Sequence, residues 1–111
     1  MSHLFSVQRA EGVLKQIEGA AIYGNTVARF GKITTTRGAV DQSNFHDYPI
    51  SRISNSPLNV RVHIIEDFVN LRPCGVGEPG VPPYTPALIN AIYNATGKRI
   101  RQLPIGDKIE I

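Results

Sequence analysis

A helical repeat of apolar and small residues that begins at Gly12 limits most strongly what this chain can fold into. Apolar or small side chains recur there every three or four residues, and Gly31 follows Phe30 as a helix stop. One side of the expected helix carries only small residues: Gly19, Ala20, Ala21, Gly24 and Ala28. Small side chains let another backbone approach closely, although each glycine costs up to about 1 kcal/mol of helix stability. We therefore expect a tightly packed helix over residues 12–30, with packing on a sheet as the simplest reason.

Residues 32–64 predict a small sheet after this helix. Two short runs, Lys32–Thr36 and Ala39–Ser43, flank Arg37-Gly38, which is typical of a hairpin. Residues 58–64 alternate between apolar and polar side chains and predict a half-buried strand. That alternation places His63 on the polar face, where a solvated histidine is commoner than a ligand. The tail over residues 100–105 is a candidate for a further short strand.

A second helix is predicted near the end of the chain. Thr85-Pro86 matches an N-cap followed by proline at the first helical position, and Gly97 matches a helix stop. Leu88, Ala91, Ile92 and Ala95 form one apolar face. The order of elements predicts an α+β fold, in which a small antiparallel sheet (the hairpin plus one or more strands) is packed by two helices in the order α-β-β-β-α.

The length of 111 residues allows one domain at most. Residues 1–11 are unpatterned and are expected to be a variable lead-in, with residues 12–111 as the single domain. The lone Cys74 excludes an internal disulfide, a Cys-rich zinc site and an iron–sulfur cluster held by this chain alone. Cys74 itself is either a nucleophile or a packed thiol, and the second interpretation is favoured because no histidine lies near it in sequence.

Charge and hydropathy indicate the cellular location of the chain and the classes of partner that it could bind. A net charge of +3 is a weak bias, and the basic run 98–101 has no interleaved aromatic residues, so no nucleic-acid partner is expected. No apolar run approaches the roughly 20 residues that span a bilayer. Arg9 and Glu11 interrupt the N-terminus before any signal-peptide stretch develops. We therefore expect a cytoplasmic protein with no membrane association.

The loop 73–80 (PCGVGEPG) is the strongest candidate for chemistry. Its glycines let the backbone approach a ligand, and Pro79 restricts the conformation of Glu78. A carboxylate on a rigid turn is suited to be a general base where its surroundings exclude water. The alternative is an ordinary surface glutamate in a turn. The adjacent pair His46 and Asp47 has poor spacing for a metal site, because neighbouring residues lie on opposite faces of a strand.

Several segments of the chain, in register from about Gly12 to Ile105, resemble one family. This family is the xanthine oxidase-type molybdenum hydroxylases, and the similar region is the C-terminal part of their large, molybdopterin-binding subunit. The nearest branch is the isoquinoline 1-oxidoreductase beta subunit with its aldehyde-oxidising relatives. The resemblance is carried by segments 16–20 (QIEGA), 42–49 (QSNFHDYP), 75–80 (GVGEPG), 82–83 (PP), 87–92 (ALINAI) and 95–105 (ATGKRIRQLPI).

The resemblance implies roles for individual residues. Glu78 matches the general base in the oxidative hydroxylation of N-heterocycles or aldehydes, at a molybdopterin-type molybdenum cofactor. Gln16 matches a glutamine that approaches the pterin, and the backbone of Val76 and Gly77 would line the metal centre. Electrons would leave through iron–sulfur clusters on a partner subunit.

The family subunit is several times longer, and its upstream cofactor loops and substrate pocket have no counterpart here. We therefore expect that the chain alone binds no cofactor and has no activity. Its small-residue helix face and Glu78 loop would be covered by a complementing portion of the molybdenum subunit or by a second copy of the chain in a dimer. The alternative is a freestanding, non-catalytic interaction module derived from this fold.

Overall fold

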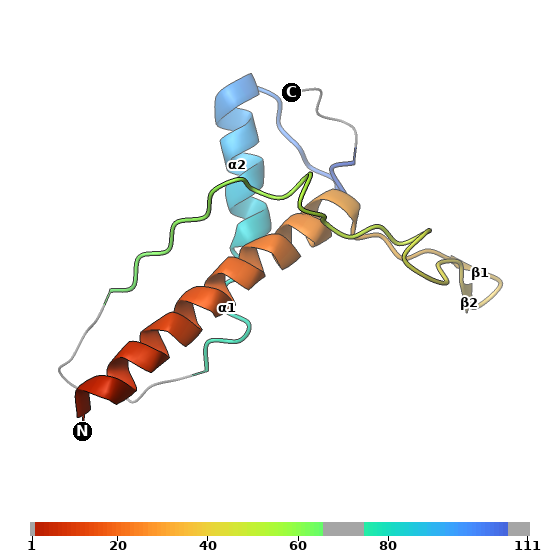
Figure 1. Ribbon diagram of the computed structural model, residues 1–111. Helices are drawn as coiled ribbons and strands as arrows, with labels where there is room; N and C mark the ends of the chain where they lie inside the picture. Colours follow the sequence, from red (N-terminus) through yellow and green to blue (C-terminus); the bar gives the residue numbers. More distant parts are fainter. Residues whose placement is uncertain (1, 66–74, 107–111) are drawn as a thin grey trace.

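The computed structural model describes residues 2–65 and 75–106, with side chains described from Ala10 onward. Its elements are helix α1 (Ser2–Phe30), strands β1 (Thr35–Thr36) and β2 (Ala39–Val40), and helix α2 (Tyr84–Thr96) (Figure 1). Two helices and a small antiparallel sheet confirm the α+β class. Helix α1 begins before Gly12, because residues 2–11 contain no glycine or proline that would interrupt it.

The predicted hairpin is confirmed. Strands β1 and β2 pair antiparallel, with Thr35 opposite Val40 and Thr36 opposite Ala39. Arg37 and Gly38 between them have φ angles of 51° and 81°, and two positive φ angles are typical of a type I′ turn. The side chain of Gln42 extends the pairing, since its Oε1 accepts the Thr34 N–H at 2.8 Å and its Nε2 donates to Thr34 Oγ1 at 2.9 Å.

The predicted strand over residues 58–64 is wrong. These residues belong to no strand, and the side chain of Leu58 is fully exposed. Alternating apolar and polar side chains suit a β-strand, but a strand also needs a neighbouring strand to form hydrogen bonds with its backbone. The sheet among the described residues contains only β1 and β2. The order is therefore α-β-β-α, and His63 lies exposed in an irregular segment.

The tail over residues 100–105 is not a strand either. It returns to the end of α1, where the Ile105 N–H donates to the Ala28 carbonyl at 2.8 Å and the Gly106 N–H donates to the Arg29 carbonyl at 3.0 Å. These carbonyls belong to the last turn of α1, which has no partners within the helix. The tail thus caps α1 and buries the side chain of Ile105.

Helix α2 ends as predicted and begins two residues earlier than predicted, at Tyr84 instead of Pro86. Gly97 has φ 71°, and its N–H donates to the Tyr93 carbonyl at 2.8 Å, which is a left-handed C-terminal cap. The N-cap position is Pro83 and makes no side-chain hydrogen bond, so the predicted Thr85 cap is wrong. Pro82 and Pro83 already direct the chain into the first turn, and Thr85 lies inside the helix.

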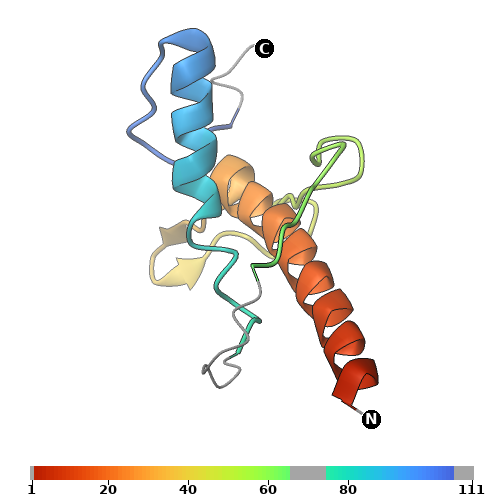
Figure 2. The same cartoon turned by 90° about the vertical axis from the view of Figure 1, so that its left-hand side faces the viewer.

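Two small residues of α1, Ala20 and Gly24, lie against the Glu78 loop and the start of α2 instead of a sheet. Figure 2 shows the start of α2 beside α1. A Cβ added at Gly24 would lie 2.6 Å from Tyr84 Cβ, at the start of α2. A Cβ added at Gly80 would lie 2.7 Å from Ala20 Cβ. Carbon atoms of real side chains do not approach so closely, so each contact requires glycine. The predicted tight packing of α1 is present, but α1 packs on the Glu78 loop and α2 and not on the expected sheet.

Asn25, a polar residue that is only 5% exposed, connects α1 to the following loop. Its Nδ2 donates to Ser51 Oγ at 2.9 Å and to the Asn55 carbonyl at 3.1 Å. Arg29 donates to the same carbonyl at 3.1 Å. These partners satisfy the Nδ2 group of the buried amide, so polar contacts help to hold this loop on the helix.

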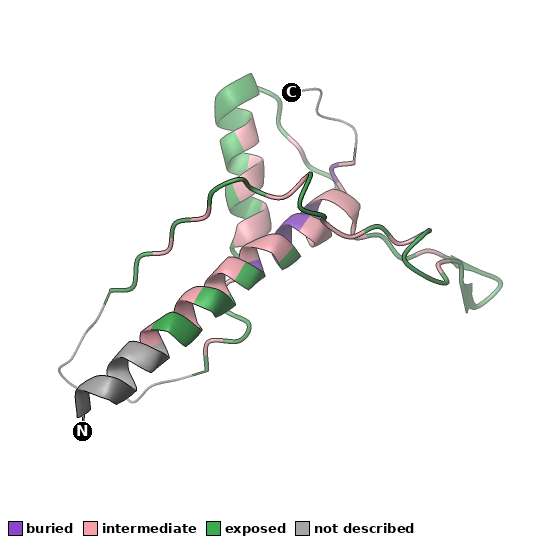
Figure 3. Cartoon of the chain, viewed as in Figure 1, coloured by how far each residue is buried: buried purple, intermediate pink, exposed green. Residues whose placement is uncertain are grey.

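The chain is far more open than its length predicts (Figure 3). Among the described residues only Ala20, Ala28 and Ile105 are buried apolar side chains. The radius of gyration is 17.7 Å, whereas a compact domain of this length has about 13 Å. The accessible surface is 9376 Å², against about 6,100 Å² for a compact monomer of this mass. No helix within the described ranges is long and apolar enough to cross a membrane.

Candidate functional site

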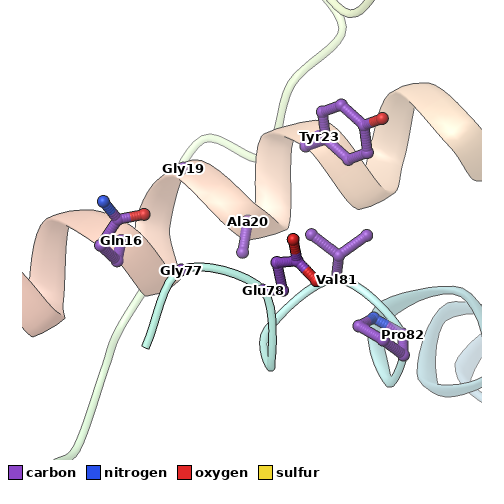
Figure 4. Close-up of a pocket in the computed structure, with 8 residues that line it drawn as sticks. All are labelled: Gln16, Gly19, Ala20, Tyr23, Gly77, Glu78, Val81 and Pro82. Atoms are coloured by element: carbon purple, nitrogen blue, oxygen red, sulfur yellow. The ribbon is translucent and has the colours of Figure 1, made fainter. Parts of the chain in front are cut away.

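A hollow of about 510 Å³ lies between α1 and the Glu78 loop, within the size range of small-molecule sites (Figure 4). The structure brings three of the four predicted site residues, Gln16, Gly77 and Glu78, to its walls. Val76, the fourth, is half-buried beside Gly77 and does not line the hollow. The complete lining is Gln16, Gly19, Ala20, Tyr23, Gly77, Glu78, Val81 and Pro82.

Helix α1 supplies one wall through its 3.6-residue period. Gln16, Gly19, Ala20 and Tyr23 are spaced by three or four residues and therefore share a face. A Cβ at Gly19 would meet nothing within 4 Å, so the wall is open there. Tyr23, which is 62% exposed, is not among the residues predicted from the sequence. Its position seven residues after Gln16 is the signal that could have identified it.

A tight turn supplies the opposite wall. The Val81 N–H donates to the Glu78 carbonyl at 3.1 Å, and the Tyr84 N–H donates to the Val81 carbonyl at 3.2 Å. This second bond leads directly into α2. Gly80 contacts Ala20 within the turn, and Pro79 restricts the backbone at Glu78. Glu78 is therefore held on a turn that is docked on α1 at one end and continues into α2 at the other.

The Glu78 carboxylate extends from the turn into the space beside Ala20 and Val81 (Figure 4). The residue is exposed, and within the described ranges its carboxylate has no ion-pair partner. The other polar side chains of the hollow are the Gln16 amide, which both donates and accepts hydrogen bonds, and the Tyr23 hydroxyl. The arrangement offers one proton acceptor and a small number of hydrogen-bonding groups to a ligand from outside.

Metal-ligating side chains do not gather in the described part of the chain. No group of three His, Cys, Asp or Glu side chains there could hold a metal ion. His46 Nε2 lies 3.5 Å from Asp47 Oδ2 on the surface, as an isolated pair. Cys74, the candidate nucleophile or packed thiol, lies outside the described residues.

Comparison with known proteins gives similarity over almost the whole chain. The chain is 35% identical over 99 residues to the isoquinoline 1-oxidoreductase beta subunit of Brevundimonas diminuta, covering 89% of this chain. It is 36% identical over 100 residues to a probable xanthine dehydrogenase subunit of Bacillus subtilis, covering 86% of this chain. It is 33% identical over 95 residues to "Membrane-bound aldehyde dehydrogenase [pyrroloquinoline-quinone]" of Gluconacetobacter polyoxogenes, again covering 86% of this chain.

The similarity involves only a small part of each relative. The chain spans 12% of the length of the first relative, 13% of the second and 12% of the third. No protein-family model matches the chain, and no solved structure gives a significant match.

Proposed function

Because the chain belongs to the xanthine oxidase-type molybdenum hydroxylase subunits, we propose that it forms the wall of their catalytic site that carries the general base. In this proposal the chain is the C-terminal part of the large subunit, and the reaction is the oxidative hydroxylation of an N-heterocycle or an aldehyde. The observation that supports it is the single hollow that unites Gln16 and Glu78 from distant parts of the sequence.

Glu78 performs the proton transfer. Its carboxylate accepts the proton of the oxygen that attacks the electron-poor carbon of the substrate, and this oxygen becomes the hydroxyl or carbonyl oxygen of the product. A positioned base of this kind contributes about 10²–10⁴-fold in rate. When bound, the molybdenum cofactor would supply the attacking oxygen, which water replaces after each turnover, and the redox centre that takes up the two electrons and the proton of the substrate C–H bond as it breaks.

The residues of the hollow fit one edge of such a cofactor. The Gln16 amide can donate to and accept from the pterin, and Gly77 leaves its backbone accessible because it has no side chain. A Cβ at either Gly19 or Gly77 would meet nothing within 4 Å, so both walls have room for a ligand. The backbone of Val76 continues this edge. One amide and a short stretch of backbone do not enclose a cofactor, so the chain holds it only together with the rest of the subunit and is inactive alone.

Partner subunits follow from the same reasoning. Several relatives are named as subunits, which implies larger enzymes in which they have partners. For this chain we propose a complementing portion of the molybdenum subunit, which closes the hollow. A separate iron–sulfur subunit then receives the electrons.

Turnover by a complemented complex tests the proposal. The chain is combined with the upstream portion of an isoquinoline 1-oxidoreductase-type subunit, the molybdenum–pterin cofactor and an artificial electron acceptor, and the oxidation of isoquinoline and of an aldehyde is measured. We expect turnover only from the complex, with Glu78→Gln lowering kcat by about 10²–10⁴-fold. Pyrroloquinoline quinone in place of the molybdenum cofactor should give no turnover.

Glu18→Gln is the matched control, because it removes an exposed carboxylate of α1 that pairs with Lys15 at 3.4 Å and does not line the hollow. This variant should turn over at the rate of the unchanged chain. Equal loss in both variants, or full activity of Glu78→Gln, would refute the role of Glu78.

The second candidate function is the non-catalytic interaction module. Exposed large apolar side chains, such as Ile53, Leu58 and Ile65, favour it independently of Glu78, because exposed apolar surface is commonly buried by association with a second copy. Sedimentation equilibrium distinguishes the two candidates. A stable dimer that neither binds the upstream portion nor takes up cofactor supports the module, whereas a chain that binds the upstream portion supports the enzyme.

A further inference from the structure

Gly80 makes the closest approach between the Glu78 loop and α1. A Cβ added there would lie 2.7 Å from Ala20 Cβ and 3.3 Å from Ile17 Cδ1. Ala20 is only 6% exposed, and its Cβ is attached directly to the helix backbone, so it cannot rotate away. An added methyl group at position 80 would therefore have to lift the loop from the helix.

The contact lies between the two polar groups of the hollow. Ala20 follows Gln16 by one helical turn on the same face of α1, and Gly80 follows Glu78 by two residues. The hydrogen bond from the Val81 N–H to the Glu78 carbonyl, at 3.1 Å, closes a tight turn around this glycine. A displacement of position 80 is therefore transmitted to Glu78 through very few bonds.

The other glycines of the loop do not make such a contact. A Cβ at Gly75 or at Gly77 would meet nothing within 4 Å. The second close approach in this region joins Gly24 to Tyr84, which fixes the start of α2. Among its described glycines, the loop therefore approaches α1 through Gly80 alone, at the end from which the chain continues into α2.

From these contacts we infer that Gly80, seated on Ala20, is a positioning residue that sets the separation between the Glu78 carboxylate and the Gln16 amide. The inference rests on the proposed function of Glu78. Gly80 has no reactive side chain, but in this inference its contact with Ala20 determines the position of the Glu78 carboxylate. A displacement of about 1 Å in such a group can cost about 10²-fold in rate.

The experiment uses three variants of the full chain: G80A, the double variant A20G/G80A, and G75A as the control. Nuclear Overhauser contacts between protons at positions 20 and 80 are measured in each, without cofactor. We expect G80A to lose this contact and G75A to keep it. The double variant should regain it, because it removes the helix methyl group that the new methyl group meets, and Ile17 can move the end of its flexible side chain.

The same variants are then assayed in the complemented enzyme. We expect G80A to lower kcat by about 10²-fold with little change in KM, and A20G/G80A to recover at least tenfold. If G80A keeps the contact or its kcat, or if the double variant shows no recovery, the inference is overturned. Failure of the proposed function gives a different result. In that case the Glu78→Gln enzyme would keep its normal kcat, whether or not the contact between positions 20 and 80 is lost in G80A.

Discussion

Asp47 illustrates how one exposed side chain can hold a loop without a hydrophobic core. Its carboxylate accepts the Asn44 N–H at 2.9 Å and the Ser43 N–H at 2.9 and 3.1 Å, and the Ser43 hydroxyl at 3.0 Å. The N–H groups of Asn44 and Ser43 lower the pKa of Asp47 from 3.8 to about 2, because they stabilise the charged form. The loop at 43–47 therefore depends on this charge.

We predict that this turn opens when Asp47 is protonated. Since its pKa in the folded chain lies below that in the unfolded chain, the stabilisation is complete above about pH 4 and is lost as the pH falls through about 2. The amide proton resonances of Ser43 and Asn44 should shift over this range. In Asp47→Asn the two resonances should already be displaced at pH 6 and should not titrate. Unchanged resonances in that variant would contradict the role of the charge.

Gln16 and Glu78 show how much of the candidate site could be predicted at the level of residues. The glycines and proline around Glu78 indicate a rigid acidic turn, and only the family resemblance connects this turn to Gln16. They share the hollow because Gly80 packs on Ala20 of α1 and Gly24 of α1 packs on Tyr84 of α2. No local sequence pattern predicts these long-range contacts. Tyr23, an exposed aromatic residue, has no chemical signature of its own, and only its position seven residues after Gln16 on the same helix face could have indicated it.

At the level of elements, two predictions based on local backbone rules are confirmed, whereas the Thr85 N-cap and the strand over 58–64 are wrong. The turn at Arg37-Gly38 and the stop at Gly97 depend on backbone conformations that glycine favours. The predicted strand over 58–64 required a neighbouring strand. Its apolar alternation instead leaves Val60 and Val62 half-buried and Leu58 exposed.

Replacing glycine by alanine should have opposite effects on helix stability at Gly97 and at Gly12, and this difference tests the account of the helices. Gly97 has φ 71°, where alanine is strained, so Gly97→Ala should destabilise α2 by about 1 kcal/mol. Gly12 lies within α1, and a Cβ there would meet nothing within 4 Å, so Gly12→Ala should stabilise α1 by up to about 1 kcal/mol. Urea unfolding followed by circular dichroism at 222 nm measures both. The same sign in both variants would contradict the assignment of Gly97 as the cap.

At the level of the whole molecule, the chain exposes more surface than a compact protein of its mass. Its accessible surface exceeds that of a compact monomer by roughly 3,000 Å², which is more than the roughly 1,000–2,500 Å² that each partner buries in most permanent interfaces. Ile53, Leu58 and Ile65 are each more than 90% exposed. The β1–β2 hairpin extends away from α1 and α2 with little contact to either (Figure 1). Surface of this kind predicts a partner that covers the loop 50–65 and the hollow.

Leu58→Lys tests whether this surface is an interface. Because Leu58 is fully exposed, the substitution should change the unfolding free energy of the free chain by less than about 0.5 kcal/mol. It should weaken binding to the upstream portion of the subunit about tenfold, measured by calorimetric titration. Asn59→Lys adds the same charge at the next exposed position and is the control. Equal weakening by both variants would show that charge, and not burial of Leu58, causes the effect.

Hydrogen–deuterium exchange tests most directly the central claim that a larger body closes the hollow between α1 and the Glu78 loop. Exchange is measured by mass spectrometry on the chain alone and with the upstream portion of an isoquinoline 1-oxidoreductase-type subunit in excess. We predict slower exchange in the complex for peptides that contain residues 16–23 and 75–81, the two walls of the hollow. Unchanged exchange at both walls, in a complex shown to have formed, would contradict the claim.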